Sequence, residues 1–132
     1  MTINGRFYFE LTSNGNLLGE YSNNHLNSGI EVEAAKRVAE GREEFANLKG
    51  SEFHGEFLSI WTQGKSGSPP CYLEISRDKN RLQIFSLVWS KKKGGKLYHG
   101  EGMLAGHLLI GNYMGGSGPT NNDGISEEPV SE

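Results

Sequence analysis

Hydrophobic and polar residues alternate along most of the chain, which is the pattern of β-strands with one buried face. Apolar side chains take every second position over 7–12, and the pattern returns over 17–22. Asn14-Gly15 separates these two segments. Because both residues tolerate positive φ, Asn-Gly is a strong hairpin signal. The sequence therefore predicts an N-terminal β-hairpin.

The period changes after this hairpin. Ser28 and Glu31 fit a capping box, in which a serine N-cap and a glutamate three residues later start a helix. Apolar residues recur at helical spacing, at Ile30, Ala34, Val38, Phe45 and Leu48, and charged residues take most of the other positions. We expect an amphipathic helix over 29–48, packed outside the sheet or at one end, with Gly41 weakening its middle.

Strand periodicity resumes in the second half of the chain. Five further strands are predicted, at 53–62, 71–76, 81–89, 96–104 and 107–113. Short turns between successive strands favour an antiparallel meander. The expected fold is mostly β, with about seven strands closing into a small barrel and one amphipathic helix outside it.

Alternation also divides each strand into an inner and an outer face. The bulky residues of the predicted interior are Phe7, Phe9, Leu11, Leu17, Tyr21, Phe53, Phe57, Trp61, Leu73, Ile75, Phe85, Leu87, Trp89, Tyr98 and Leu104. The interior of such a small barrel is just wide enough for side chains to fill it. Apolar residues of the opposite face are Leu58, Ile60, Ile84 and Val88. The predicted helix or a second copy of the chain would cover them.

Length and charge indicate one domain with a tail. The 132 residues suit a single core, and 19 glycines account for much of the low hydrophobic fraction of 35%. The charged residues after residue 114 are all acidic: Asp123, Glu127, Glu128 and Glu132. Residues 1–114 therefore carry 13 basic and 12 acidic side chains, a net charge of +1 within a total of −3. We predict one barrel-like domain over 1–114 and a flexible acidic tail over 115–132.

A nearly neutral body lacks the broad basic surface of nucleic-acid binders. The densest positive charge is Lys91, Lys92, Lys93 and Lys96. One lysine turn makes few phosphate contacts, so we expect no nucleic-acid partner. No apolar run reaches the roughly 18–20 residues of a membrane span, and the N-terminus lacks a signal-peptide pattern. These features predict a soluble, cytoplasmic protein with no membrane association. An exported protein whose signal had been removed would look the same.

Few motifs point to chemistry. Cys71 is the single cysteine, and at the start of a predicted strand it is expected to be a buried thiol, with a reactive thiol as the alternative. Neither a Gly-x-Ser-x-Gly nucleophile motif nor a complete phosphate-binding loop occurs. We expect no cofactor.

Two His-x-Glu pairs are the candidates for catalysis. His54 with Glu56, and His99 with Glu101, each share a strand face because residues i and i+2 do so. On neighbouring strands these groups would form a metal site or an acid–base cluster. All four fall on the predicted outer face, beside glycines. Solvated strand faces are therefore favoured, and no metal site is predicted.

Aromatic residues offer a different candidate, a ligand pocket at one barrel mouth. Its predicted lining is Trp61, Tyr72, Phe85, Trp89 and Tyr113, with the loop over 64–70 as a lid. The alternative is that these side chains form only an aromatic core.

Several short segments carry a resemblance to a known group of barrels. They are Gly55-Glu56-Phe57 with Trp61, Leu87-Val88-Trp89, Gly100-Glu101-Gly102-Met103, residues 108–113, and the opening segments 3–7 and 15–21. These segments resemble the calycin group, the lipocalin- and avidin-like up-and-down β-barrels. The resemblance implies a barrel that holds a small apolar molecule at one end. A helix inserted after the second strand departs from that pattern, and no biotin-contacting residue can be transferred.

We therefore expect a non-catalytic β-barrel module that binds a small apolar ligand or a partner. Two alternatives stay open. One is an enzyme that uses the His-x-Glu pairs, with or without a metal. The other is an interaction domain that forms a homo-oligomer through its outer apolar face.

Overall fold

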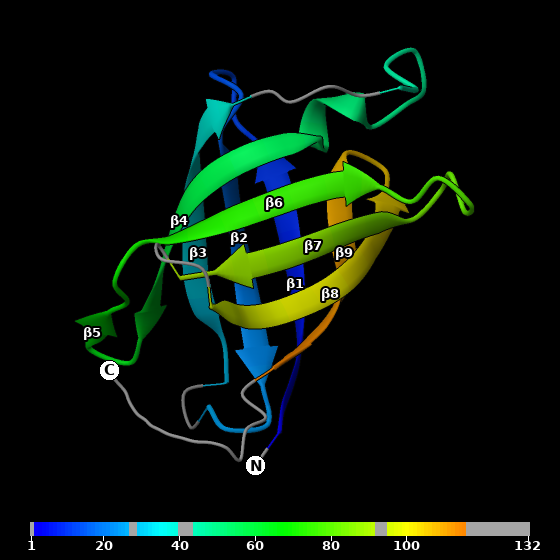
Figure 1. Cartoon of the computed structure of the whole chain (residues 1–132). Coiled ribbons are helices and arrows are strands. Elements are labelled where there is room, and N and C mark those ends of the chain that lie inside the picture. The colour runs from blue at the N-terminus through cyan, green and yellow to red at the C-terminus, as the bar shows by residue number, and fades with distance from the viewer. Residues whose placement is uncertain (1, 27–28, 40–43, 92–94, 116–132) are drawn as a thin grey trace.

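Eight antiparallel strands close into a barrel in the computed structural model, which describes residues 2–26, 29–39, 44–91 and 95–115 (Figure 1). The strands are β1 (Ile3–Leu11), β2 (Leu17–Asn23), β3 (Glu31–Ala39), β4 (Gly55–Gln63), β6 (Cys71–Arg77), β7 (Phe85–Ser90), β8 (Lys96–Ala105) and β9 (Leu108–Gly115). Each strand pairs with its neighbours in the chain, and β1 pairs with β9 to complete the ring. The two-residue strand β5 (Ser66–Gly67) pairs only with the end of β4.

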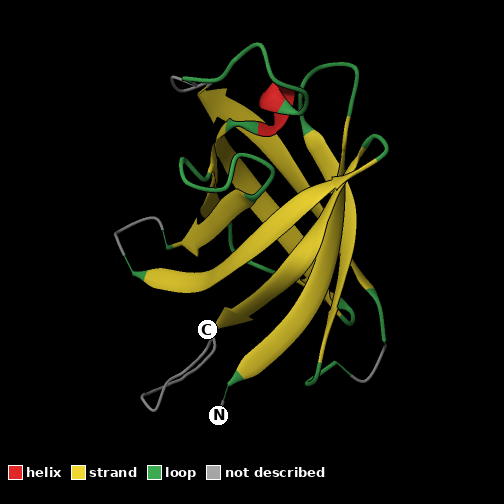
Figure 2. Ribbon diagram, turned by 90° about the vertical axis from the view of Figure 1, so that its right-hand side faces the viewer, coloured by secondary structure: helices red, strands yellow, loops and turns green. Residues whose placement is uncertain are grey.

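The barrel has two different ends. In Figure 1 the strands β4, β6, β7 and β8 cross in front of β1, β2, β3 and β9. Figure 2 shows the single short helix, η1 (Ser51–Phe53), at the end opposite the N-terminus. The end that holds the N-terminus is called the open end below, and the end that holds η1 the closed end.

The alternation of apolar and polar residues predicted most of the barrel interior correctly. The buried apolar residues are Phe7, Phe9, Leu17, Tyr21, Ala35, Phe53, Phe57, Cys71, Leu73, Ile75, Phe85, Leu87, Trp89, Leu109 and Tyr113. Four members of the predicted interior are instead half-buried and pack against this core: Leu11, Trp61, Tyr98 and Leu104. Burial of the Cys71 thiol is confirmed, and it raises the pKa of that thiol to about 12.

The N-terminal hairpin is confirmed. Leu11 pairs with Leu17 across the turn, and Gly15 adopts a φ of 81°. This left-handed conformation costs glycine little, which explains its place in the turn.

The helix expected over 29–48 is wrong. Residues 31–39 form β3, residues 44–48 lie in turns, and residues 40–43 are outside the described part of the chain. β3 pairs with β2 on one side and β4 on the other, so its backbone completes two ladders at once. Tertiary hydrogen bonding of this kind overrides a local preference that amounts to tenths of a kcal/mol per residue.

The strand count was also too low, since the ring has eight strands and β5 adds a ninth among the described residues. The strand of the ring that the sequence did not predict is β3. Without a helix, nothing in the described chain covers the outer face of β4, and Ile60 is 50% exposed there.

The closed end is held by two buried or half-buried arginines. Arg77 donates to the carbonyls of Leu82 and Lys49, and its guanidinium lies 4.6 Å from the centre of the Phe85 ring. Arg37 lies over Phe57 in the same way.

The Arg37 guanidinium also donates to carbonyls of the surrounding turns, at Gly15, His54 and Glu52. Charge-assisted hydrogen bonds to carbonyls satisfy turns that have no strand partner. These side chains, together with η1, thus close this end of the barrel.

Two expectations fall largely outside the described residues. The predicted tail over 115–132 is described only at Gly115, the last residue of β9. Of the lysine turn, Lys91 and Lys96 are described and residues 92–94 are not. Within the described chain, no helix has the length and apolar character needed to cross a membrane.

Two substitutions on the outer face of β3 distinguish a strand from a helix. Ala34→Thr should raise the free energy of unfolding by roughly 0.5 kcal/mol, because a β-branched residue fits a pleated surface. Val32→Ala should lower it by a similar amount. A helix would reverse both signs, since alanine is the best helix former. Urea unfolding of both variants against the parent protein measures the signs.

Candidate functional site

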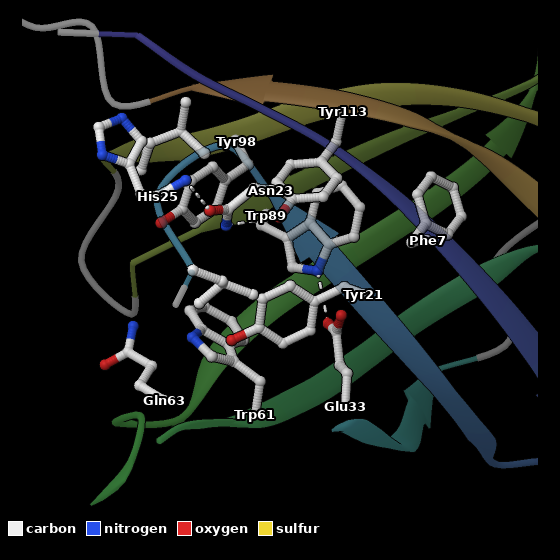
Figure 3. Close-up of a pocket in the computed structure, with 12 residues that line it drawn as sticks. Phe7, Tyr21, Asn23, His25, Glu33, Trp61, Gln63, Trp89, Tyr98 and Tyr113 are labelled. Carbon is white, nitrogen blue, oxygen red and sulfur yellow. Dashed lines mark hydrogen bonds between the residues drawn. The ribbon is translucent and has the colours of Figure 1, made fainter. Parts of the chain in front are cut away.

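A cavity of about 180 Å³ opens at the open end of the barrel (Figure 3). The residues that line it are Ile3, Phe7, Tyr21, Asn23, His25, Leu26, Glu33, Trp61, Gln63, Trp89, Tyr98 and Tyr113. Half of these side chains are aromatic rings of Phe, Tyr or Trp. The lining comes mainly from the first halves of β1, β3 and β8 and from the ends of β2, β4, β7 and β9. Because neighbouring strands run antiparallel, these termini meet at one end of the barrel.

The aromatic rings of the cavity form one continuous chain of contacts. Phe7 meets Trp89 with ring centres 5.8 Å apart, Trp89 meets Tyr113 at 5.8 Å, and Tyr113 meets Tyr98 at 5.6 Å. Trp61 then lies 6.1 Å from Tyr98. These distances suit edge-to-face packing, which fixes the position of each ring. The cavity wall is therefore preorganised.

Tyr113 is held in place by a glycine and by an amide. A Cβ atom at Gly5 would lie 2.4 Å from the Tyr113 ring, so only glycine allows the ring to rest against β1. Asn23 donates its amide N–H to the Tyr113 hydroxyl at 3.0 Å. Burial raises the pKa of Tyr113 to about 12, although the Asn23 bond opposes the shift, so the hydroxyl is neutral at physiological pH.

A carboxyl group lies in the wall of this aromatic cavity. Glu33, on β3, is only 5% exposed. Its Oε2 atom accepts hydrogen bonds from Ser59 Oγ at 2.6 Å and from Trp89 Nε1 at 2.7 Å. Figure 3 shows the indole N–H of Trp89 directed at the Glu33 carboxyl. The ring chain and the carboxyl group therefore form one connected site.

Burial raises the pKa of Glu33 to about 7, because the interior disfavours the charged form. The hydrogen bonds from Ser59 and Trp89 act in the opposite direction, but desolvation is the larger effect. Near neutral pH the group is therefore divided between its ionised and neutral forms. A carboxyl group with such a pKa, inside a cavity, marks a candidate functional site.

A second inward carboxylate, Glu31, precedes Glu33 on the same face of β3 and is 7% exposed. Its two oxygens accept hydrogen bonds from Thr62 Oγ1 at 2.5 Å and from the Gly64 N–H at 3.1 Å. Glu31 does not line the cavity. Its contacts tie β3 to the end of β4.

The structure brings together three of the five residues predicted to line a pocket. Trp61, Trp89 and Tyr113 line the cavity. Tyr72 is 38% exposed on the outer face of β6, and Phe85 is fully buried toward the closed end, under Arg77. The loop over 64–70 forms a short hairpin with β4, and none of its residues lines the cavity.

The two His-x-Glu pairs do not meet. Glu56 lies on β4, with His54 just before that strand, and His99 and Glu101 lie on β8; β6 and β7 separate β4 from β8 in the barrel. Glu101 forms an exposed ion pair with Arg81 at 2.5 Å. No group of three or more potential metal ligands occurs within the described ranges.

Glu33, Tyr21 and Tyr98 are site residues that were not predicted as such. Glu33 was assigned to the polar face of the supposed helix. One signal could have identified it: with β3 as a strand, Glu31, Glu33 and Ala35 share a face, and that face must point inward if Val32 points outward.

A second hollow, of about 320 Å³, lies at the closed end near Lys49, Glu52 and His107. These three side chains are exposed. The hollow is larger than the aromatic cavity but has no buried polar group in its lining, so it offers no preorganised contact.

No family model matches the chain, and comparisons with curated proteins and with solved structures likewise produced no match. The support for the candidate site therefore comes from its geometry alone.

Glu33 should make stability depend on pH. Its pKa is about 7 in the folded protein and near 4.5 in an unfolded chain. Between these values the folded state holds a proton that the unfolded state has lost. The free energy of unfolding should therefore fall as pH rises through this window, by roughly 3 kcal/mol from this group.

Comparison with Glu33→Gln isolates this contribution, because the other titrating groups are shared. Urea unfolding at pH 4.5 and pH 8 should show the variant gaining stability relative to the parent at the higher pH. The same pH dependence in both proteins would contradict a buried, titrating Glu33.

Proposed function

We propose that this chain is a non-catalytic binding module that takes a small molecule into the open end of its barrel. The observation that carries the proposal is the cavity, which combines a preorganised aromatic wall with one buried carboxyl group. Binding sites commonly have such an apolar lining with a few placed polar groups. Ser59, the serine that donates to Glu33, is fully buried and does not line the cavity, so it is not placed to act as a nucleophile on a ligand there.

The size of the cavity limits the ligand. Its volume of about 180 Å³ is close to that of an engineered cavity of about 150 Å³ that binds benzene. Sites for drug-sized ligands occupy roughly 300–1,000 Å³. We therefore infer a ligand about the size of one six-membered ring, which is smaller than a typical drug molecule.

The resemblance of the sequence to the calycin group supports this proposal. That resemblance implies a small ligand at one end of an up-and-down barrel, and the closed eight-stranded meander is compatible with it. Such a barrel shape is shared by other protein groups, so the cavity remains the main support.

A fragment titration tests the proposal. A panel of single-ring compounds, neutral and charged, is added to ¹⁵N-labelled protein, and the two tryptophan indole N–H resonances are followed by NMR. At least one compound should shift the Trp89 resonance in a saturable way, because the indole of Trp89 lies in the cavity wall. If no compound of any charge binds, the proposed function is wrong.

Two matched variants locate the binding. Trp61→Leu removes an aromatic side chain that lines the cavity and should weaken binding at least tenfold. Tyr72→Leu removes one from the outer face and should leave binding unchanged. Equal effects of the two substitutions would place the ligand elsewhere.

A second candidate function is self-association through the outer face of β2, β3 and β4. Leu18 pairs with Ala34, and Ala34 with Ile60, so these residues form a row across three strands. Leu18 is 54% exposed and Ile60 50% exposed. Apolar patches of this kind often mark interfaces, and a two-fold symmetric dimer needs only one such patch.

Sedimentation velocity over a range of concentrations tests the self-association. Ile60→Glu should shift the chain to monomer, whereas Ile110→Glu, on the outer face of β9, should not. A parent protein that stays monomeric at all concentrations would exclude this second function and leave the first unaffected.

A further inference from the structure

One oxygen of the Glu33 carboxyl group is left without a hydrogen bond. Ser59 and Trp89 both donate to Oε2, and Oε1 accepts nothing from the described residues. A carboxylate has acceptor positions on both oxygens, and an unused one is costly inside a protein. Because the side chain is 95% buried and lines the cavity, Oε1 is an acceptor available to a ligand.

The described interior contains no cation to neutralise Glu33. The groups around it are Tyr21 from β2, Glu31 from β3, Cys71 from β6, Tyr98 from β8 and Tyr113 from β9. Burial raises the pKa of the thiol and of the three phenols, so all four are neutral near pH 7.

The remaining charges near the cavity do not alter this. Glu31 is a second carboxyl group and supplies no positive charge, and His25, the only basic residue of the described lining, lies exposed at the rim. An ionised Glu33 is therefore a buried negative charge without a positive partner among the described side chains, which is an unfavourable state.

The rings around this carboxyl group favour positive charge as well. Trp89 touches Glu33 through its indole N–H, and Tyr113 and Tyr98 continue the ring chain from Trp89. Tryptophan and tyrosine attract cations through the negative potential of their ring faces, and aromatic cages bind organic ammonium groups in this way.

We propose that the ligand of this cavity is a small organic ammonium ion and that Glu33 Oε1 accepts a hydrogen bond from its N–H group. This inference rests on the proposed binding function and adds the class of ligand. The carboxylate supplies the counter-charge, and the aromatic wall encloses the apolar part of the ligand. A primary or secondary ammonium group fits because it has an N–H to donate.

A metal ion fits this site less well. Calcium takes 6–8 oxygen ligands, and magnesium requires near-octahedral oxygen coordination. The described lining offers one carboxyl group surrounded by rings. Organic cations need only one hydrogen-bonding charge and apolar contact, which this cavity provides.

Three probes with the same ring and different charge test the proposal: benzylamine, benzyl alcohol and benzoate. Their dissociation constants are measured by titration followed with the Trp89 indole resonance at pH 8, where Glu33 is mostly ionised. Benzylamine, which is cationic, should bind at least tenfold more tightly than benzyl alcohol. Benzoate should bind most weakly.

Substitution of the carboxyl group should remove this preference. Glu33→Gln keeps the shape of the side chain and should bind benzylamine and benzyl alcohol about equally. Glu74→Gln, an exposed change on β6, is the matched control and should keep the parent preference. Dispersion of the indole resonances verifies that each variant is folded.

The parent protein alone gives an independent readout through pH. With a Glu33 pKa of about 7, lowering the pH from 8 to 6 should weaken benzylamine binding roughly tenfold, because protonation removes the counter-charge. Benzyl alcohol should change much less. At pH 6.5, binding of benzylamine should also release protons, which calorimetry in two buffers of different ionisation enthalpy detects.

The outcomes separate the ligand class from the function. If benzyl alcohol binds as tightly as benzylamine at pH 8, or more tightly, the ammonium ligand is wrong but the binding module stands. Binding of benzoate in preference would overturn the inference in the same way. If none of the three probes binds, the inference fails, and the wider fragment panel decides whether the binding function fails with it.

Discussion

Closure of the barrel through β3 is the constraint from which the rest of the structure follows. β3 is the only strand between β2 and β4, and its backbone hydrogen-bonds to both. Without it, two strands would each expose a row of unpaired backbone groups, which is an unfavourable edge. The free energy gained by completing two ladders exceeds the helix preference of a segment rich in alanine and charged residues.

Closure also decides which side chains enter the interior. Successive residues of a strand point to opposite faces, so a strand that places Val32 outside must place Glu31 and Glu33 inside. A register shifted by one residue would bury Val32 and Ala34 and turn Glu31 and Glu33 outward, but it would break the observed pairings of β3 with both β2 and β4. The buried carboxyl groups are therefore a consequence of the ring of pairings, and the cavity acquires its charged group in the same step.

The alternation of apolar and polar residues predicted most of this interior, because in most strands the large apolar residues all lie on the inner face. The prediction failed where the inner face carries no large apolar residue. β3 has acidic residues inside and apolar residues outside, so its pattern matched a helix. Tyr72 and Phe85 illustrate a second limit: composition identifies aromatic residues, but only pairing and strand ends show which of them reach the open end.

The two ends of the barrel use charge in opposite ways. At the closed end, Arg37 and Arg77 donate hydrogen bonds to backbone carbonyls and lie over the rings of Phe57 and Phe85, so both charges help to hold the turns together. At the open end, Glu33 has one oxygen that accepts two hydrogen bonds and one that has no partner among the described residues. A protein tolerates such an unfavourable group where the rest of the structure supplies enough stability, and such groups concentrate at functional sites. The closed end thus stabilises the barrel, and the open end is available for ligand binding.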